Sequence, residues 1–346
     1  MMEILDDLNV IAERDPQGAL DTIADSAAQL AWDARLEQPD SGNFSPLKIV
    51  LAGMGGSAQP GKLAANWLNL EIPFSVVSGY TLPHWVDENT LVIASSFSGN
   101  TEETISCLEF AEERGATVVV MASGGKLIDI ARERNLPFIQ LMKVPQPRYS
   151  AIAQLKAISR FLEHYGVAEH ICNEIDDLGE AVADVVGQSV ASVETIENPA
   201  KRLALKCAGK TPIIYASSLF APVAFKWKIS FNENAKNTAW WNELPEFSHN
   251  EFIGWSSHPV EKPFAVIDLR SSFDHPRIER RFELTNQLLS GKRPAASEVQ
   301  LKGDSILAQM IYGFILADFV SIYLGILNGV NPTPVALVEE LKKELG

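Results

Sequence analysis

Three hydroxyl side chains and a glycine follow a short apolar run, residues 91–93, in the first third of the chain. They are Ser96, Ser98, Gly99 and Thr101. The apolar run predicts a buried strand, and a helical pattern begins directly after the hydroxyls. The free N–H groups and the dipole at the start of a helix attract anions, and each hydroxyl can donate a hydrogen bond to a phosphate oxygen. The cluster therefore predicts a phosphate-binding loop, although a capped helix with a serine-rich turn would show the same residues.

A second loop of the same kind lies upstream. The apolar residues 49–52 are followed by Gly53, Gly55, Gly56 and Ser57. Two such loops, each between a strand and a helix, predict one anion-binding crevice at the carboxyl edge of a parallel sheet. The glycines do not fit the strict G-x-G-x-x-G spacing of dinucleotide-binding loops, and no acidic residue follows the next strand. Nucleotide binding is therefore not expected.

Five motifs together resemble those of a known family. They are GMGGS at 53–57, SFSGNTEET at 96–104, VPQPR at 144–148, FNENAK at 231–236 and ELPEFSHNEFIGW at 243–255. The set is similar to the bifunctional phosphoglucose/phosphomannose isomerases, members of the sugar isomerase (SIS) domain superfamily. The serine loop marks only the superfamily, whereas the NEN-x-K and PE-x-x-HN pair is far more specific. Phe97 stands where the family commonly has a tyrosine.

The resemblance implies an acid–base site for aldose–ketose isomerisation, which moves a proton between C1 and C2 through an enediol. Glu233 corresponds to the base, and a carboxylate suits that role where burial raises its pKa. His249 corresponds to the group that assists ring opening. Arg148 corresponds to the arginine that stabilises the enediolate or fixes an active-site water. Lys342 corresponds to a lysine that pairs with the histidine, with Lys343 as the alternative register.

The remaining substrate contacts combine the loop pattern with the resemblance. The expected phosphate ligands are Ser57, Ser96, Ser98 and Thr101. Further substrate contacts are expected from Gly55, Gly56 and Thr333, and a shift of two residues would place Val335 where Thr333 is expected. The Thr333 segment lies where the family sets the space around C2, on which mannose 6-phosphate activity depends.

Ordinary structural roles compete with these assignments. Glu233 and Lys236 at i and i+3 could form a surface pair, and His249 could be a hydrogen-bonded core histidine. Two acidic residues, Glu243 and Glu246, precede His249 at intervals of three and could suggest a metal site. Pro245 argues against a regular helix through them, and proton transfer by a carboxylate needs no metal. No metal or cofactor is therefore expected.

The order of elements predicts an α/β fold in which each of two SIS domains has a parallel sheet flanked by helices. Strands are expected at 47–52, 74–78, 91–95, 117–122, 137–141, 212–216, 264–269 and 298–301. Helical patterns cover 1–40, 150–165, 173–195, 220–230, 276–290, 304–327 and 334–345. The expected domains are 1–185, with the phosphate loops, and 186–346, with the acid–base residues. A faint repeat matches residues 213–218 to the first loop and 265–272 to the serine loop, without the glycines.

Composition limits the partners. The chain has 346 residues, 46% of them hydrophobic and 21% charged, and a net charge of −15. Nucleic acid and anionic membranes are therefore poor partners, and local donors must capture a sugar phosphate against the overall field. The cysteines, Cys107, Cys172 and Cys207, lack metal-ligand spacing, and a reducing cytoplasm fits them.

The most apolar stretch, residues 306–330, contains Gln309 and Asp318. A charge inside such a stretch favours a buried helix, or one at a subunit interface, over a membrane span. The N-terminus lacks the basic residues and apolar core of a signal peptide.

The resemblance implies a metal-independent isomerase that interconverts glucose 6-phosphate, and mannose 6-phosphate, with fructose 6-phosphate. The alternatives are an isomerase of another sugar phosphate and a sugar-phosphate-binding regulator. A regulator would keep the loop hydroxyls but would not need Glu233 and His249. By the resemblance the enzyme is a cytoplasmic homodimer, and His249 reaches the active site of the neighbouring subunit.

Overall fold

The computed structural model describes residues 1–256 and 263–345, apart from the side chains of residues 342 and 345. The chain forms two compact units. The N-terminal unit comprises Asp25–Glu180, and the C-terminal unit joins Met1–Ala24 to Ala181–Gly346. The domain limits expected from the sequence, 1–185 and 186–346, stay a prediction.

The N-terminal unit is built on a six-stranded sheet in the order β1-β6-β5-β4-β2-β3. All neighbouring strands are parallel except β1, which is antiparallel to β6. The strands are β1 (Leu36–Glu37), β2 (Lys48–Gly53), β3 (Phe74–Val77), β4 (Thr90–Ser95), β5 (Thr117–Ala122) and β6 (Phe138–Gln140). The helices are α4 (Ala27–Ala31), η1 (Gly55–Ser57), α5 (Gln59–Leu68), α6 (Glu102–Glu113), α7 (Gly125–Arg134), η2 (Pro147–Tyr149), α8 (Ala151–His164) and α9 (Ile171–Asp176). The five strands expected here are confirmed as β2 to β6.

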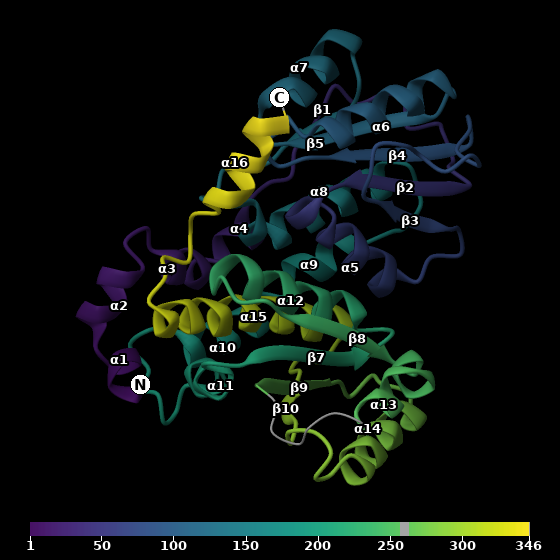
Figure 1. Cartoon of the computed structure of the whole chain (residues 1–346). Coiled ribbons are helices and arrows are strands. Elements are labelled where there is room, and N and C mark those ends of the chain that lie inside the picture. Colours follow the sequence, from purple (N-terminus) through teal and green to yellow (C-terminus); the bar gives the residue numbers. More distant parts are fainter. Residues whose placement is uncertain (257–262, 346) are drawn as a thin grey trace. The chain divides into compact units, whose positions relative to one another are not determined.

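Helices cover both faces of this sheet (Figure 1). Helices α6 and α7 pack on the face that carries Val92 and Val120. Helices α5 and α8 lie on the opposite face, where Leu51 touches Gly61 of α5 so closely that a Cβ there would stand 2.9 Å from Leu51 Cδ1. Because both faces are buried, the central strands read as continuous apolar runs rather than as alternating patterns.

The C-terminal unit has a four-stranded parallel sheet in the order β10-β9-β7-β8. The strands are β7 (Thr211–Ser217), β8 (Trp240–Leu244), β9 (Phe264–Arg270) and β10 (Ser297–Gln300). The N-terminal helices are α1 (Met2–Asp6), α2 (Leu8–Arg14) and α3 (Ala19–Ala24), and α10 (Gly179–Ser189) begins at the unit boundary. The others are α11 (Pro199–Cys207), α12 (Ala221–Asn234), η3 (Glu246–His249), α13 (Glu251–Gly254), α14 (Pro276–Leu288), α15 (Ile306–Asn328) and α16 (Ala336–Leu345).

The two sheets share one topology, which confirms the faint repeat. In the first sheet, β2 lies between β3 and β4, and β5 is next to β4. In the second sheet, β7 lies between β8 and β9, and β10 is next to β9. Strands β2, β3, β4 and β5 therefore correspond to β7, β8, β9 and β10. The SFSGNT loop after β4 corresponds to residues 271–275 after β9.

Helix α15 is the long apolar segment of the sequence. Its start is capped by Ser305, whose Oγ accepts a hydrogen bond from the N–H of Ala308 at 3.0 Å. It ends at Gly329, where φ is +70°. Its most apolar window has a mean hydropathy of 2.0, long and apolar enough to cross a membrane, yet 94% of that window is buried inside the protein. The expectation of a buried core helix is confirmed.

A polar seam joins α12 to α15 inside this core. Lys226 Nζ lies 2.7 Å from Asp318 Oδ1, and Ser230 Oγ donates to the same oxygen at 2.8 Å. Further along, Asn234 Nδ2 donates to Ser321 Oγ at 2.9 Å. Lys226, Ser230 and Asn234 are 0% exposed, so these bonds lie away from water and fix the register of the two helices.

Some elements differ from the expectations. The helical pattern at 173–195 is interrupted between α9 and α10, and residues 1–40 form four short helices and β1 instead of long ones. Strand β8 was not expected, because Trp240 and Trp241 are 59% and 36% exposed and the strand has no apolar periodicity. Pairing with β7 creates it. The three cysteines are buried free thiols, as expected of structural residues.

The buried ion pair gives a stability prediction. Asp318→Asn keeps the size of the side chain but leaves the Lys226 ammonium buried without its counter-charge. We expect the free energy of unfolding to fall by about 3–5 kcal/mol, measured by urea unfolding. Asp304→Asn, at an exposed site before α15, should change it by less than about 0.5 kcal/mol. Lys226→Met combined with Asp318→Leu should recover most of the loss, and equal stability of Asp318→Asn and the wild type would refute the assignment.

Candidate active site

The two glycine-serine loops of the N-terminal unit meet at the carboxyl ends of β2 and β4. The N–H of Phe97 donates to Ser57 Oγ at 2.9 Å, and Ser95 Oγ donates to the main-chain oxygen of Ser57 at 3.0 Å. Residues 57 and 97 come from different loops, so these bonds join the loops into one structure. The two loops follow adjacent strands, β2 and β4, as the expected crevice requires; anion binding there stays a prediction.

The hydroxyls of the serine loop have different roles. Ser96 is buried; its Oγ accepts from the N–H of Gly99 at 3.1 Å and lies 2.8 Å from Thr101 Oγ1. Thr101 occupies the N-cap position of α6, and its side chain makes no capping hydrogen bond to that helix. Ser98 is exposed, and its Oγ accepts from the N–H of Asn100 at 3.3 Å. Ser96 thus orients Thr101 at a helix start, where unsatisfied N–H groups favour an anion.

The serine loop packs against a third loop, residues 123–126, which follows β5. Gly99 has φ +72°, and a Cβ placed on it would stand 1.7 Å from the main-chain oxygen of Gly124. Ser123 Oγ donates to the main-chain oxygen of Phe97 at 2.7 Å, and the N–H of Lys126 donates to Asn100 Oδ1 at 3.0 Å. Sequence reasoning missed this support. The Ser-Gly-Gly run after the strand at 117–122 was the available signal, since such runs mark tight turns.

Arg148 lies against the first loop. A Cβ on Gly56 would stand 3.1 Å from the Arg148 nitrogen, so the glycine permits a close approach of two backbones. The arginine is 2% exposed, its Nη1 donates to Gln146 Oε1 at 3.2 Å, and its guanidinium carbon lies 4.8 Å from the Tyr149 ring centre. The structure thus brings Arg148 together with the loop of Gly55, Gly56 and Ser57.

In the C-terminal unit, Glu233 lies in the last turn of α12 between two anchored asparagines. Asn234 bonds to Ser321 of α15, and Asn232 Nδ2 donates to the main-chain oxygen of Asn237 at 2.9 Å. Helix α15 comes close here, since a Cβ on Gly325 would stand 2.7 Å from the Asn234 oxygen. The N-E-N motif therefore fixes a half-buried carboxylate at a helix end held on both sides.

The segment with Thr333 lies beside the same helix end. Lys236 Nζ donates to the main-chain oxygens of Glu233 at 2.5 Å and of Pro332 at 2.9 Å. Thr333 is 5% exposed, and its N–H donates to Asn331 Oδ1 at 3.0 Å. The lysine of NEN-x-K therefore ties the Thr333 segment to the end of α12.

His249 is the last residue of η3 and is exposed. The segment begins after a cis Leu244–Pro245 peptide bond, and the hydroxyl of Ser218 donates to the Leu244 oxygen at 2.9 Å. The expectation that no regular helix runs from Glu243 to His249 is confirmed, because Glu243 lies in β8 and Glu246 is the first residue of η3. Burial, and secondarily the nearby Glu246 carboxylate, raises the pKa of Glu243. Within residues 1–256 and 263–345, no group of three or more His, Cys, Asp or Glu could hold a metal ion.

Lys342 lies in α16, and its side chain is outside the described part of the chain. The choice between Lys342 and Lys343 therefore stays a prediction. The choice between Thr333, which is buried, and Val335, which is half-buried, also stays a prediction.

The loop after β9 carries an acidic side chain where the serine loop has none. Its Asp274 carboxylate accepts a hydrogen bond from the N–H of Ser271 at 3.2 Å, so an internal anion occupies the loop that corresponds to SFSGNT. The pKa of Asp274 is raised, because burial outweighs the hydrogen bonds from Ser217 and Ser271 that lower it. A carboxylate in this position repels a second anion.

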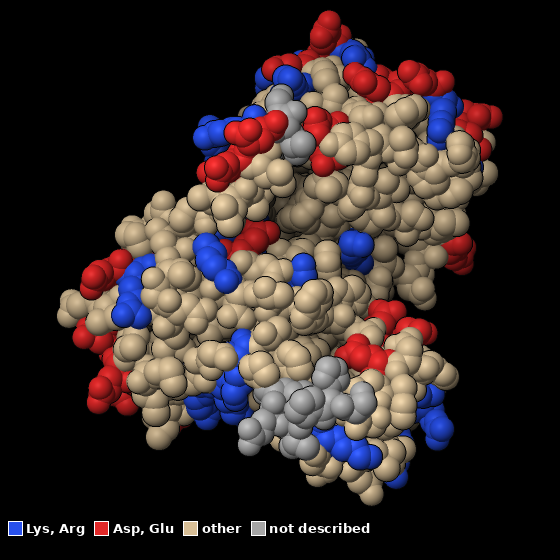
Figure 2. All heavy atoms as spheres, viewed as in Figure 1, with Lys and Arg blue, Asp and Glu red and all other residues tan. Residues whose placement is uncertain are grey.

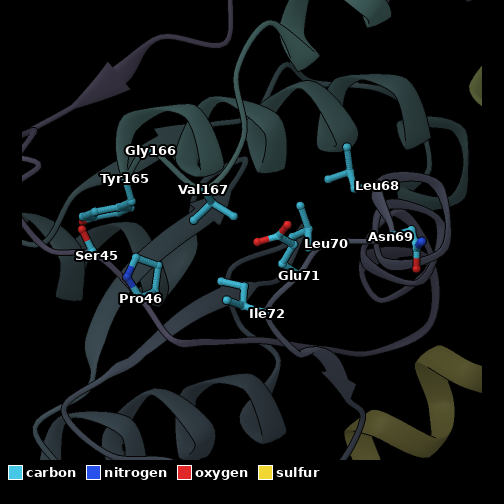
Figure 3. A pocket seen from close by; sticks show the side chains of 10 residues that line it. All are labelled: Ser45, Pro46, Leu68, Asn69, Leu70, Glu71, Ile72, Tyr165, Gly166 and Val167. Atoms are coloured by element: carbon cyan, nitrogen blue, oxygen red, sulfur yellow. The ribbon is translucent and has the colours of Figure 1, made fainter.

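The pocket in Figure 3, about 390 Å³ in volume, lies at the other edge of the first sheet. It is lined by Ser45 and Pro46, just before β2, and by Leu70 and Ile72, just before β3. Those positions are at the amino ends of the strands, away from the phosphate loops. Glu71 is the charged side chain among the lining residues, so the pocket does not suit a phosphate.

On the face of the molecule shown in Figure 2, acidic and basic side chains are interspersed.

The comparisons with known proteins define the class first. Residues 45–158 match the SIS domain model, and residues 196–345 match the model of the bacterial phospho-glucose isomerase C-terminal SIS domain. A glucose-6-phosphate isomerase-like protein of Thermus thermophilus shares the fold, with a TM-score of 0.68 at 19% identity over 98% of each chain. The chain is thus a protein of two SIS domains.

The particular family follows from closer relatives. The chain is 36% identical over 307 residues to the bifunctional phosphoglucose/phosphomannose isomerase of Aquifex aeolicus (strain VF5), covering 88% of this chain and 92% of that protein. It belongs to the bifunctional phosphoglucose/phosphomannose isomerase family. A D-glucosamine-6-phosphate 4-epimerase of Sulfolobus acidocaldarius is also similar, at 35% identity over 64% of this chain and 70% of the epimerase.

The packing of Gly99 gives a test of the anion site. Gly99→Ala should displace the serine loop from Gly124 and weaken binding of inorganic phosphate by at least about tenfold, the loss of one hydrogen bond to a charged group. Calorimetric titration measures this affinity. Gly115→Ala is the matched control, since Gly115 has the same φ of +72° and only a side-chain carbon of Glu88 within 4 Å of the added Cβ. Equal phosphate affinity of the two variants would contradict the assignment.

Proposed function

We propose that this chain interconverts glucose 6-phosphate and fructose 6-phosphate, and mannose 6-phosphate and fructose 6-phosphate, through an enediol intermediate. The observation that carries the proposal is the 36% identity, over nearly the whole chain, to an isomerase named for these two activities. The anchored Glu233 and the joined hydroxyl loops support it, because they offer a base and an anion site.

The reaction needs a base that moves one proton between C1 and C2. Glu233 is proposed as that base, because the two flanking asparagines hold its helix turn and leave a carboxylate as the reactive group. Arg148 is proposed to stabilise the enediolate oxygen or to fix a water beside it, a role that suits a buried guanidinium with fixed charge.

The other groups bind or prepare the substrate. His249 is proposed to move the proton that opens the sugar ring, with Lys342 as its partner. Phosphate is proposed to bind the hydroxyls of Ser57, Ser96 and Thr101 and the first N–H groups of α6, with Ser98 at the exposed rim. Gly55, Gly56 and Thr333 complete the proposed substrate contacts. Each step is a proton transfer, so neither a cofactor nor a metal enters the proposal.

Coupled assays with the hexose phosphates test the function. Glucose 6-phosphate and mannose 6-phosphate should both yield fructose 6-phosphate, with and without a chelator, and free glucose should be a very poor substrate. Glucosamine 6-phosphate, followed by NMR, tests the activity named for the Sulfolobus relative. Binding of sugar phosphates without any conversion would favour a regulator.

The base assignment makes a quantitative prediction. Glu233→Gln should lower kcat by roughly 10²–10⁴-fold and leave KM nearly unchanged, because the side chain is proposed to act on the reacting carbons and not on the phosphate. Steady-state kinetics measure both constants. Glu279→Gln, an exposed glutamate in the first turn of α14, is the control and should keep full turnover. Near-normal kcat in Glu233→Gln would place the base elsewhere.

The active site is further proposed to form in a cytoplasmic homodimer, with His249 acting on the subunit opposite to its own Glu233. Mixing inactive Glu233→Gln and His249→Asn proteins tests this arrangement. A mixed dimer has one site with both defects and one with neither. Random reassortment makes about half the dimers mixed, so roughly a quarter of wild-type activity should return. Activity that stays absent although mixed dimers form would place both residues in one subunit's site.

A further inference from the structure

His249 lies on a segment too short to hold itself in place. Elements η3 and α13 have four residues each, and helices of that length are not stable alone. Glu246, His249 and Asn250 are exposed. Within η3, Phe247 supplies the buried contact, being 1% exposed with its ring centre 4.7 Å from that of Tyr215 in β7. Phe252 and Trp255 pack into the same hydrophobic cluster as Phe247. These contacts hold the apolar side of the segment, so the exposed side, which carries His249, needs a polar contact to fix it.

Glu251 supplies a second attachment, two residues after His249. Its Oε1 accepts a hydrogen bond from the hydroxyl of Tyr215, and its Oε2 accepts one from Asn242 Nδ2 at 2.7 Å. Tyr215 and Asn242 are paired across β7 and β8, so their side chains leave the same face of the sheet. The carboxylate thus bridges two adjacent strands. The backbone N–H of Glu251 donates to Asn250 Oδ1 at 2.6 Å.

The strand side of this attachment is rigid. Tyr215 is 1% exposed, and the guanidinium carbon of Arg293 lies 5.5 Å from its ring centre. Arg293 Nη2 in turn donates to Asn286 Oδ1 at 2.7 Å and lies 3.8 Å from Asp268 Oδ2. On the short segment, Glu251 is the side chain that accepts from both strands, so its removal would loosen the segment on the sheet and leave Tyr215 and Asn242 without this acceptor.

We propose that Glu251 is a positioning residue for His249: its carboxylate fixes the η3–α13 segment on β7 and β8 and thereby sets where the imidazole stands. This inference rests on the proposed function, in which His249 moves the ring-opening proton. Glu251 does not act on the substrate. Its effect on turnover passes through His249, so loss of Glu251 should alter kcat and leave phosphate binding, and hence KM, nearly unchanged.

A cycle of four proteins tests the proposal: the wild type, Glu251→Gln, His249→Asn and the double variant. Glutamine keeps the size of the side chain but replaces one acceptor oxygen by a donor nitrogen. We expect Glu251→Gln to lower kcat by about 10- to 100-fold, the cost of a displaced catalytic group, with KM within about twofold. In the His249→Asn background, assayed with concentrated enzyme, the same change should have no further effect. Equal losses in both backgrounds would overturn the proposal, because they would show a general structural role.

A second measurement does not depend on activity. The imidazole signal of His249 is assigned among the six histidines by its absence in His249→Asn. It should shift or broaden in Glu251→Gln and in Tyr215→Phe, and stay unchanged in Glu279→Gln, another first-turn glutamate. An unchanged signal in Glu251→Gln would refute the attachment. If the wild type lacked isomerase activity, the proposed function would fail, and this signal would still decide whether Glu251 positions His249.

Discussion

The placement of the proposed base depends on one buried ion pair, between Lys226 and Asp318. Two opposite charges in a core are tolerated when they are paired and hydrogen-bonded, and Ser230 supplies the extra bond. The pair forms at one relative position of α12 and α15, so, together with the hydrogen bond from Asn234 to Ser321, it sets the register of the two helices. Glu233 lies seven residues, about two turns, beyond Lys226. Its position is therefore set by the core.

The two sheets show how a repeated topology can divide two tasks. After β4, hydroxyls and helix N–H groups form the proposed site for an external anion, and Gly99 lets the loop pack closely on Gly124. After β9, the Asp274 carboxylate accepts the loop N–H itself. A chain with net charge −15 repels sugar phosphates at long range, so the proposed phosphate site depends on local donors. The serine loop, residues 96–101, has no Asp or Glu of its own, whereas the loop after β9 has Asp274.

Much of this architecture was predictable from sequence, since local pattern carries it. Strand β4 could be predicted because both its faces are buried, and the serine loop between β4 and α6 because its residues are adjacent. Phosphate binding by that loop stays a prediction. Strand β8 could not be predicted, because its exposed tryptophans show no strand pattern until β7 pairs with it. Nor could the link of Glu251 to Tyr215, since the partners are 36 positions apart. The sequence identifies candidate catalytic side chains, whereas contacts between residues distant in the sequence determine which of these side chains have a fixed position.

The C-terminal unit contains both ends of the chain, with residues 25–180 inserted between its two parts. Arg14 Nη1 donates to the Ile326 oxygen at 2.6 Å, and the N–H of Thr195 donates to Asp6 Oδ1 at 2.7 Å. During synthesis the first helices must therefore wait for partners that the ribosome makes after the inserted unit, which can already fold. The C-terminal unit, which contains the proposed base, therefore forms only when two segments separated by residues 25–180 come together. A chain truncated before its C-terminal helices would contain the two glycine-serine loops but no complete C-terminal unit.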